Sequence, residues 1–133
     1  MFVDVNKTEE RYTAHVEESS HTLSPKQALI MCDMSSHSPL ADCVKTGEVI
    51  PIDVAGYAVI SIHNPKAKKE KNYKYFIVED KDGKTYYTGS NSFVEQFMFF
   101  WDVMKDNMDE FQVEVFCQPS QNYETGFLTL RMK

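Results

Sequence analysis

The stretch VIPIDVAGYAVISIH, residues 49–63, constrains the fold more than any other part of the sequence. It is long and rich in valine and isoleucine, whose branched side chains favour β-strands. Gly56 stands in its middle, and a glycine inside a strand often marks a bulge or a sharp bend. We therefore expect a long strand that curls near Gly56 and takes part in two portions of a sheet.

The sequence after this stretch predicts four further strands. YKYFIVE (73–79) and KTYYT (84–88) are separated by DKDG, whose glycine suits a turn position with positive φ. EFQVEVFC (110–117) alternates between apolar and polar residues, and FLTLRM (126–131) forms the last strand. The tight DKDG turn makes the first two of these strands a hairpin.

SFVEQFMFFWDVMKD, residues 92–106, is the clearest helix in the chain. Its apolar residues recur with the spacing of one wide buried face. Ser92 followed three residues later by Glu95 predicts a capping box at its start. The aromatic stripe is typical of a core, so we expect Phe97 and Trp101 to be buried.

The first 45 residues have a weaker pattern. Residues 10–17 alternate and could form a strand, which would make the stretch 49–63 the second strand of the sheet. Ser24 followed by Pro25 is a helix start, and it predicts a short helix over residues 25–33. We expect this polar segment to pack on the main domain or to contact proteins.

The order strand, strand, hairpin, strand, helix, strand, loop, strand is the layout of an oligonucleotide/oligosaccharide-binding (OB) barrel. The predicted fold is mainly β (α+β), with a five-stranded OB-like barrel over residues 46–133 and one helix between its third and fourth strands. Residues 1–45 form an N-terminal extension with a short helix. The alternative is an α+β sheet with one covering helix. A chain of 133 residues suits one such domain.

Residues 46–133 resemble the small single-stranded-DNA-binding proteins of phages and mobile elements. The resemblance lies in the order and local pattern of VIPIDVAGYAVISIHN, DKDGKTYY, SFVEQFMFFWDVM, FQVEVFCQPS and GFLTLRMK. The first 45 residues have no counterpart in it. The resemblance implies an OB fold, single-stranded DNA as partner, a role in DNA replication or recombination, and replication or recombination proteins as further partners.

The net charge of −6 conceals one positive segment. Residues 63–74 carry +4, whereas the residues before and after them carry −5 each. Single-stranded nucleic acid presents phosphates and exposed base faces, so a binder needs cations along a groove and aromatic rings for stacking. NPKAKKEKNYKYF, residues 64–76, supplies both. Only two arginines occur, so bidentate reading of guanine is not expected and binding should not be sequence-specific.

The hairpin register decides which tyrosines are available to a ligand. The DKDG turn pairs Val78 with Tyr86 and sends Tyr86 toward the core with Phe76. The other tyrosines of the two strands then lie on the opposite face, and Tyr123 lies in the loop before the last strand. The predicted DNA-binding residues are Lys66, Lys68, Lys69, Lys71, Tyr73, Lys74, Tyr75, Tyr87 and Tyr123.

Other functional classes have weaker support. The spacing of His21, Cys32, His37 and Cys43 matches no zinc pattern of paired ligands, so we expect no metal site. No phosphate-binding loop, nucleophile elbow or HExxH motif occurs, and we predict a non-enzymatic protein without a cofactor. There is no secretion signal, no apolar run of membrane-spanning length and an odd number of cysteines, so we expect a cytoplasmic protein.

Two alternatives share the predicted barrel. The first is an acidic OB-like protein-interaction module that binds or inhibits a host protein, because an acidic surface can mimic DNA. The second is an oligosaccharide-binding barrel, which would also use exposed aromatic rings. DNA binding should weaken steeply with salt through counterion release, whereas sugar binding should not.

Overall fold

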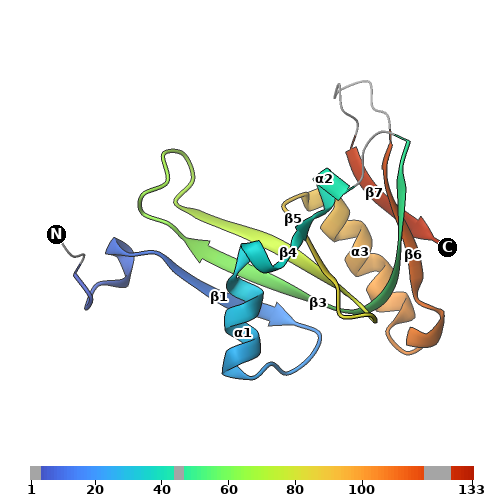
Figure 1. The fold of residues 1–133 in the computed structure, drawn as a ribbon, viewed down its shortest axis with the longest axis horizontal. Helices are drawn as coiled ribbons and strands as arrows, with labels where there is room; N and C mark the ends of the chain where they lie inside the picture. The colour runs from blue at the N-terminus through green and yellow to red at the C-terminus, as the bar shows by residue number, and fades with distance from the viewer. Residues whose placement is uncertain (1–3, 44–46, 119–126) are drawn as a thin grey trace.

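The computed structural model describes residues 4–43, 47–118 and 127–133. These residues form a mostly β fold with a curled, half-barrel sheet of seven strands (Figure 1). The strands are β1 (Thr13–Ser19), β2 (Ser38–Pro39), β3 (Val49–His63), β4 (Asn72–Asp80), β5 (Thr85–Thr88), β6 (Gln112–Gln118) and β7 (Phe127–Met132). The helices are α1 (Pro25–Cys32), α2 (Leu40–Cys43) and α3 (Asn91–Met104), with 3-10 turns η1 (Thr8–Glu10), η2 (Met34–Ser36) and η3 (Met108–Glu110).

Strand β3 connects all parts of the sheet. Its first residues, 49–53, pair with β6, and residues from Val54 onward pair with β4. Beyond the bend, residues 58–63 also pair with β1, so β6 and β1 occupy successive stretches of β3. The β3–β4 register shifts between Val54 and Gly56, as in a bulge. The predicted long strand with an irregularity at Gly56 is confirmed.

The irregularity changes which residues of β3 face which side of the sheet. Before it, Ile52 and Val54 belong to one hydrophobic cluster, which we call the first core. After it, Tyr57 and Val59 pack against the first core. The alternate positions Ala58, Ile60 and Ile62 then belong to a second core on the opposite face. One strand therefore supplies two cores.

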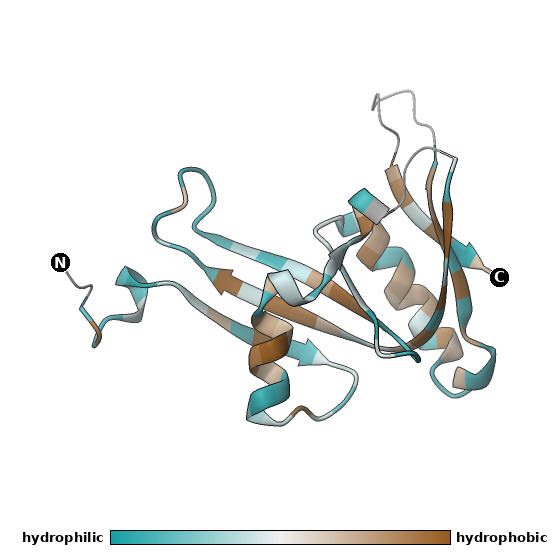
Figure 2. Cartoon of the chain, in the orientation of Figure 1, coloured by the Kyte–Doolittle hydropathy of each residue, from teal (hydrophilic) through white to brown (hydrophobic). Residues whose placement is uncertain are grey.

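The first core lies between the curled sheet and α3, where Figure 2 shows hydrophobic residues on the helix and the neighbouring strands. Phe97 has no exposed surface, and its ring contacts those of Tyr57, Phe76 and Phe111. Its predicted burial is confirmed. Trp101 is half-buried and packs against the rim of this core rather than inside it.

Helix α3 begins slightly earlier than predicted. Ser90 is its N-cap, and the Ser90 hydroxyl accepts a hydrogen bond from the Phe93 amide at 3.3 Å. The predicted cap, Ser92, lies inside the first turn, so the predicted capping box is wrong. Helix α1 follows its prediction closely: Ser24 caps it in a capping box with Gln27, and Pro25 is its first residue.

The second core lies on the other face of β3 and β4. Its buried residues are Ala58, Ile60, Ile62, Tyr75 and Ile77. Met31, Cys32 and Met34, from α1 and the turn after it, pack against this core together with Ala14 and Val16 of β1. The N-terminal extension therefore covers a sheet face that would otherwise expose isoleucine side chains to water.

The sheet has the order β2-β5-β4-β3-β6-β7, with β1 paired to β3 off this path. Strand β2 pairs in parallel with β5, so the extension supplies two strands in addition to its helix. At the other end, Gln96 of α3 donates to the Leu130 carbonyl of β7 at 3.0 Å and accepts from the Thr129 hydroxyl at 3.0 Å. The described sheet is therefore a half barrel of seven strands rather than the predicted five.

Candidate nucleic-acid interface

The outer part of the β3–β4 hairpin, residues 60–75, extends away from the half barrel, and we call it the arm (Figure 1). Its tip is the lysine loop, residues 64–71. Asn64 organises this loop: its amide donates to the Lys71 carbonyl at 2.6 Å, and its side-chain oxygen accepts from the Lys66 amide at 3.1 Å. The loop backbone is thus held by Asn64, and its lysine side chains remain available.

The lysine loop concentrates uncompensated positive charge. Lys66, Lys68, Lys69 and Lys71 are all exposed. Within the ranges that the structure describes, none of these four lysines forms an ion pair. At physiological salt the Debye length is about 8 Å, so a ligand at the tip is influenced mainly by these nearby ammonium groups. The structure brings the four predicted loop lysines together.

Lys74 differs from the loop lysines. Its ammonium lies 2.9 Å from the Glu17 carboxylate of β1, although both side chains remain partly exposed to water. Such a surface pair contributes little to stability, but it compensates the Lys74 charge locally. Lys74 also points to the opposite face of β4 from Tyr73 and Tyr75, because successive side chains of a strand alternate.

Tyr75 does not lie where a base could stack on it. The predicted hairpin register is confirmed, with Val78 opposite Tyr86 and Ile77 opposite Tyr87. The face that carries Tyr75 is nevertheless the second core, and Tyr75 is only 4% exposed. Its hydroxyl donates to the Met31 carbonyl of α1 at 2.9 Å, and burial raises the pKa of this phenol. The predicted stacking role of Tyr75 is therefore wrong.

The other predicted tyrosines are less enclosed. Tyr73 and Tyr87 are half-buried at the margin of the second core, and the Tyr87 ring meets that of Tyr75 edge-on with centroids 5.9 Å apart. Tyr123 lies outside the described residues.

Tyr12 is an exposed aromatic residue that the sequence interpretation missed. It immediately precedes β1 and is 54% exposed. Partial burial, followed by the nearby phenol of Tyr73, raises the pKa of Tyr12. The weak alternation of residues 10–17 could have indicated this position. Tyr12 lies two residues before Ala14 and four before Val16, so its side chain points to the same side of the sheet as theirs, which pack against the second core. Tyr12 therefore lies near Tyr73 of the arm, and its side chain is more exposed than that of Tyr73.

His63 connects the N-terminal segment to the base of the lysine loop through hydrogen bonds. Its Nε2 lies 3.0 Å from the Glu9 carbonyl oxygen, and its Nδ1 lies 2.7 Å from the Asn72 side-chain oxygen. A charged imidazolium can donate to both oxygens at once. These two hydrogen bonds, the one to Glu9 foremost, raise the pKa of His63. A charged His63 adds to the positive field of the arm.

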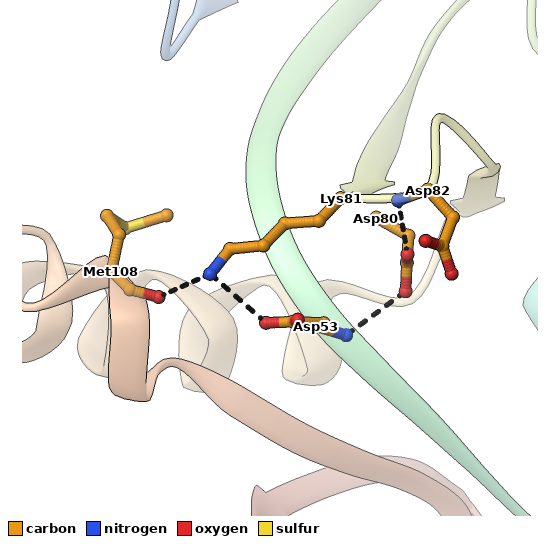
Figure 3. A network of polar contacts seen from close by, with 5 residues as sticks. All are labelled: Asp53, Asp80, Lys81, Asp82 and Met108. Atoms are coloured by element: carbon orange, nitrogen blue, oxygen red, sulfur yellow. Dashed lines mark hydrogen bonds and ion pairs between the residues drawn. The ribbon is translucent and has the colours of Figure 1, made fainter.

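A separate polar network connects the β4–β5 turn to the bend of β3 (Figure 3). The buried Asp80 carboxylate accepts from the Asp53 amide at 3.0 Å and the Asp82 amide at 2.8 Å. The Lys81 ammonium bridges the Asp53 carboxylate, at 3.4 Å, and the Met108 carbonyl, at 3.1 Å. These contacts join the β4–β5 turn to β3 and to Met108, so the network holds the turn in place.

No group of three or more histidine, cysteine, aspartate and glutamate side chains is placed to hold a metal ion in residues 4–43, 47–118 and 127–133. In the same ranges, none of the helices combines the length and the apolar character needed to cross a membrane. Comparisons with protein-family models, curated proteins and solved structures found no match. A functional assignment therefore rests on the fold and the arm.

Proposed function

We propose that this protein binds single-stranded DNA without base specificity, through the arm, in phage or mobile-element DNA replication or recombination. The observation that carries the proposal is the group of four exposed loop lysines without ion-pair partners among the described residues. Lysine suits this task, because a mobile point charge can follow a phosphate chain without requiring one fixed geometry. No catalytic step is proposed.

The order of the elements supports an OB-type assignment. Strands β3, β4 and β5, helix α3 and strands β6 and β7 follow one another as the five strands and one helix of that fold do. In OB folds the loop between the first two strands and the loop between the last two contact oligonucleotides. The first of these corresponds to the lysine loop, and the second falls between β6 and β7, outside the described residues. The curled half-barrel sheet is compatible with an OB-like barrel.

The proposed contacts combine charge with limited stacking. In this proposal the loop lysines contact phosphates, and the exposed ring of Tyr12 and the half-buried ring of Tyr73 stack on bases that leave the tip along the arm. Tyr75 takes no part because α1 covers it. Few rings and many lysines favour binding that is dominated by counterion release, and such binding weakens steeply with salt.

The proposal is tested by fluorescence anisotropy with a labelled oligo-dT strand at several concentrations between about 50 and 200 mM salt. Binding weakens with salt, so the slope of log K against log salt is negative. Replacing Lys66, Lys68, Lys69 and Lys71 by alanine should make this slope shallower by up to roughly 2.8, because each single-strand contact contributes about 0.7. A duplex of the same length should bind more weakly.

A matched variant controls for net charge. Lys26, Lys84, Lys105 and Lys133 are exposed and lie outside the arm. Changing these four to alanine removes the same charge and should leave the salt slope nearly unchanged. Equal slopes for the two variants, or equal affinity for duplex and single strand, would count against the proposal.

A further inference from the structure

Helix α3 carries large apolar side chains on both of its sides. Phe93 and Phe97 face the first core and are fully buried. Phe99 and Val103, one turn apart on the outer side, are 65% and 61% exposed. A helix at the surface of a domain normally has polar residues opposite its core stripe. The fold itself does not require an exposed phenylalanine at the centre of this helix.

Carboxylates surround these two apolar residues. Glu95 and Asp102 are exposed and lie three or four residues from Phe99, which places them with Phe99 and Val103 along one stripe of the helix surface. Asp106, also exposed, follows in the turn just beyond the last helical residue, Met104. Within the described residues, none of the three carboxylates forms an ion pair. Residues 91–110 contain five acidic residues and one basic residue, Lys105. The outer stripe is therefore both apolar and negative.

We propose that this α3 stripe, defined as Glu95, Phe99, Asp102, Val103 and Asp106, is a docking surface for a basic amphipathic segment of a partner protein. Apolar side chains of that segment would cover Phe99 and Val103, and its lysines or arginines would pair with the carboxylates. Charge complementarity selects this occupant, because the stripe repels nucleic acid and acidic peptides.

A second copy of this chain is a poorer occupant. The lysine loop is its most basic segment, but residues 64–71 contain no apolar side chain larger than proline, and Phe99 would remain exposed. The stripe also lies far from the loop, since Figure 1 places α3 at one end of the molecule and the arm at the other. Partner and DNA could be bound together, so the inference does not depend on the proposed function.

The probe is a synthetic helical peptide of leucine and lysine, with leucines on one face, titrated against the full chain while backbone amide resonances are recorded. The expected result is saturable binding with shifts concentrated in residues 95–106. A Phe99→Asn/Val103→Asn variant should bind about tenfold or more weakly, because exposed aromatic anchors dominate such interfaces. Both positions are exposed, and circular dichroism checks that the variant folds.

The matched control is Leu29→Asn/Ile30→Asn, which removes two exposed apolar side chains from α1 and should leave peptide affinity unchanged. A second variant, with Glu95, Asp102 and Asp106 changed to lysine, should lose the leucine–lysine peptide and bind a leucine–glutamate peptide instead. The proposal is overturned by no binding, by equal effects of the two asparagine pairs, or by equal affinity for a scrambled peptide of the same charge.

Discussion

Gly56 lies directly against Ser20: a Cβ atom at position 56 would stand 2.5 Å from the Ser20 hydroxyl oxygen. That hydroxyl is not free to turn away, because it accepts a hydrogen bond from the Tyr57 amide at 2.8 Å. The Ser20 amide in turn donates to the Tyr57 carbonyl at 3.0 Å. The missing side chain of Gly56 therefore allows the end of β1 to approach β3 at its irregularity.

Gly56→Ala should lower the free energy of unfolding by roughly 1–3 kcal/mol, as overpacking of a close contact does. The added methyl group must displace both the Ser20 hydroxyl and the ring of His21, which it would meet at 2.9 Å. Urea denaturation measures the change. Gly89→Ala is the matched control, since a Cβ there meets nothing within 4 Å. Similar losses for the two variants would contradict this account of Gly56.

Tyr75→Phe should lower the free energy of unfolding by about 1 kcal/mol, because the Met31 carbonyl of α1 loses its phenol donor. Burial raises the pKa of Tyr75, so the folded state holds this proton more tightly than the unfolded state. The resulting stability is complete below the unfolded value of about 10 and is lost as the pH rises above it. Urea unfolding at neutral and alkaline pH should show a shallower alkaline loss in the variant. An unchanged loss would mean that Tyr75 does not contribute to it.

His63 should titrate above the ordinary histidine value of about 6.5, because hydrogen bonds to Glu9 and Asn72 raise its pKa. The bonded imidazolium stabilises the fold fully below that value, and this contribution is lost as the pH rises through the folded-state pKa. Proton NMR of the imidazole resonances measures the titration. Asn72→Ala removes one acceptor and should lower the pKa of His63. No change in that variant would rule out the contact as a cause.

Tyr12→Ala and Tyr73→Ala should each weaken oligo-dT binding by roughly 1–3 kcal/mol, the usual effect of one stacked base. The salt slope should stay nearly constant, because stacking releases few counterions. Tyr75→Leu, which removes the aromatic ring, serves as the control and should leave the affinity of the folded protein unchanged, since that ring is covered by α1. Salt-dependent anisotropy titrations distinguish the outcomes, and a weakening by Tyr75→Leu alone would reverse the assignment of the rings.

Local patterns in the sequence predicted local structure well. The DKDG turn determines the β4–β5 register, and Gly83 has the positive φ of 87° that such a turn requires. Ser24 and Pro25 mark the start of α1 through a side-chain cap and a restricted backbone. Each of these features is decided within a few neighbouring residues, so the sequence contains all the information needed.

Contacts between distant segments were not predictable in this way. Strand alternation placed Tyr75 and Tyr86 on opposite faces of the sheet. It could not indicate that α1 would cover the face that carries Tyr75. Strand β2 has two residues and pairs with β5 far along the chain, so it has no periodicity to detect. The charged loop was recognisable because solvated lysines need no partner, whereas the burial of Tyr75 depends on Met31, a residue 44 positions away.

Because β3 supplies residues to both cores, it should tolerate insertions and deletions poorly. Inserting or deleting one residue between Gly56 and Ile60 would turn Ile60 and Ile62 from the second core toward the first. It would also shift the pairing with β1 and β4 together. The lysine loop beyond His63 has no such constraint, since its lysines are exposed. Among relatives, we expect β3 to keep its length and the loop to differ in both length and number of lysines.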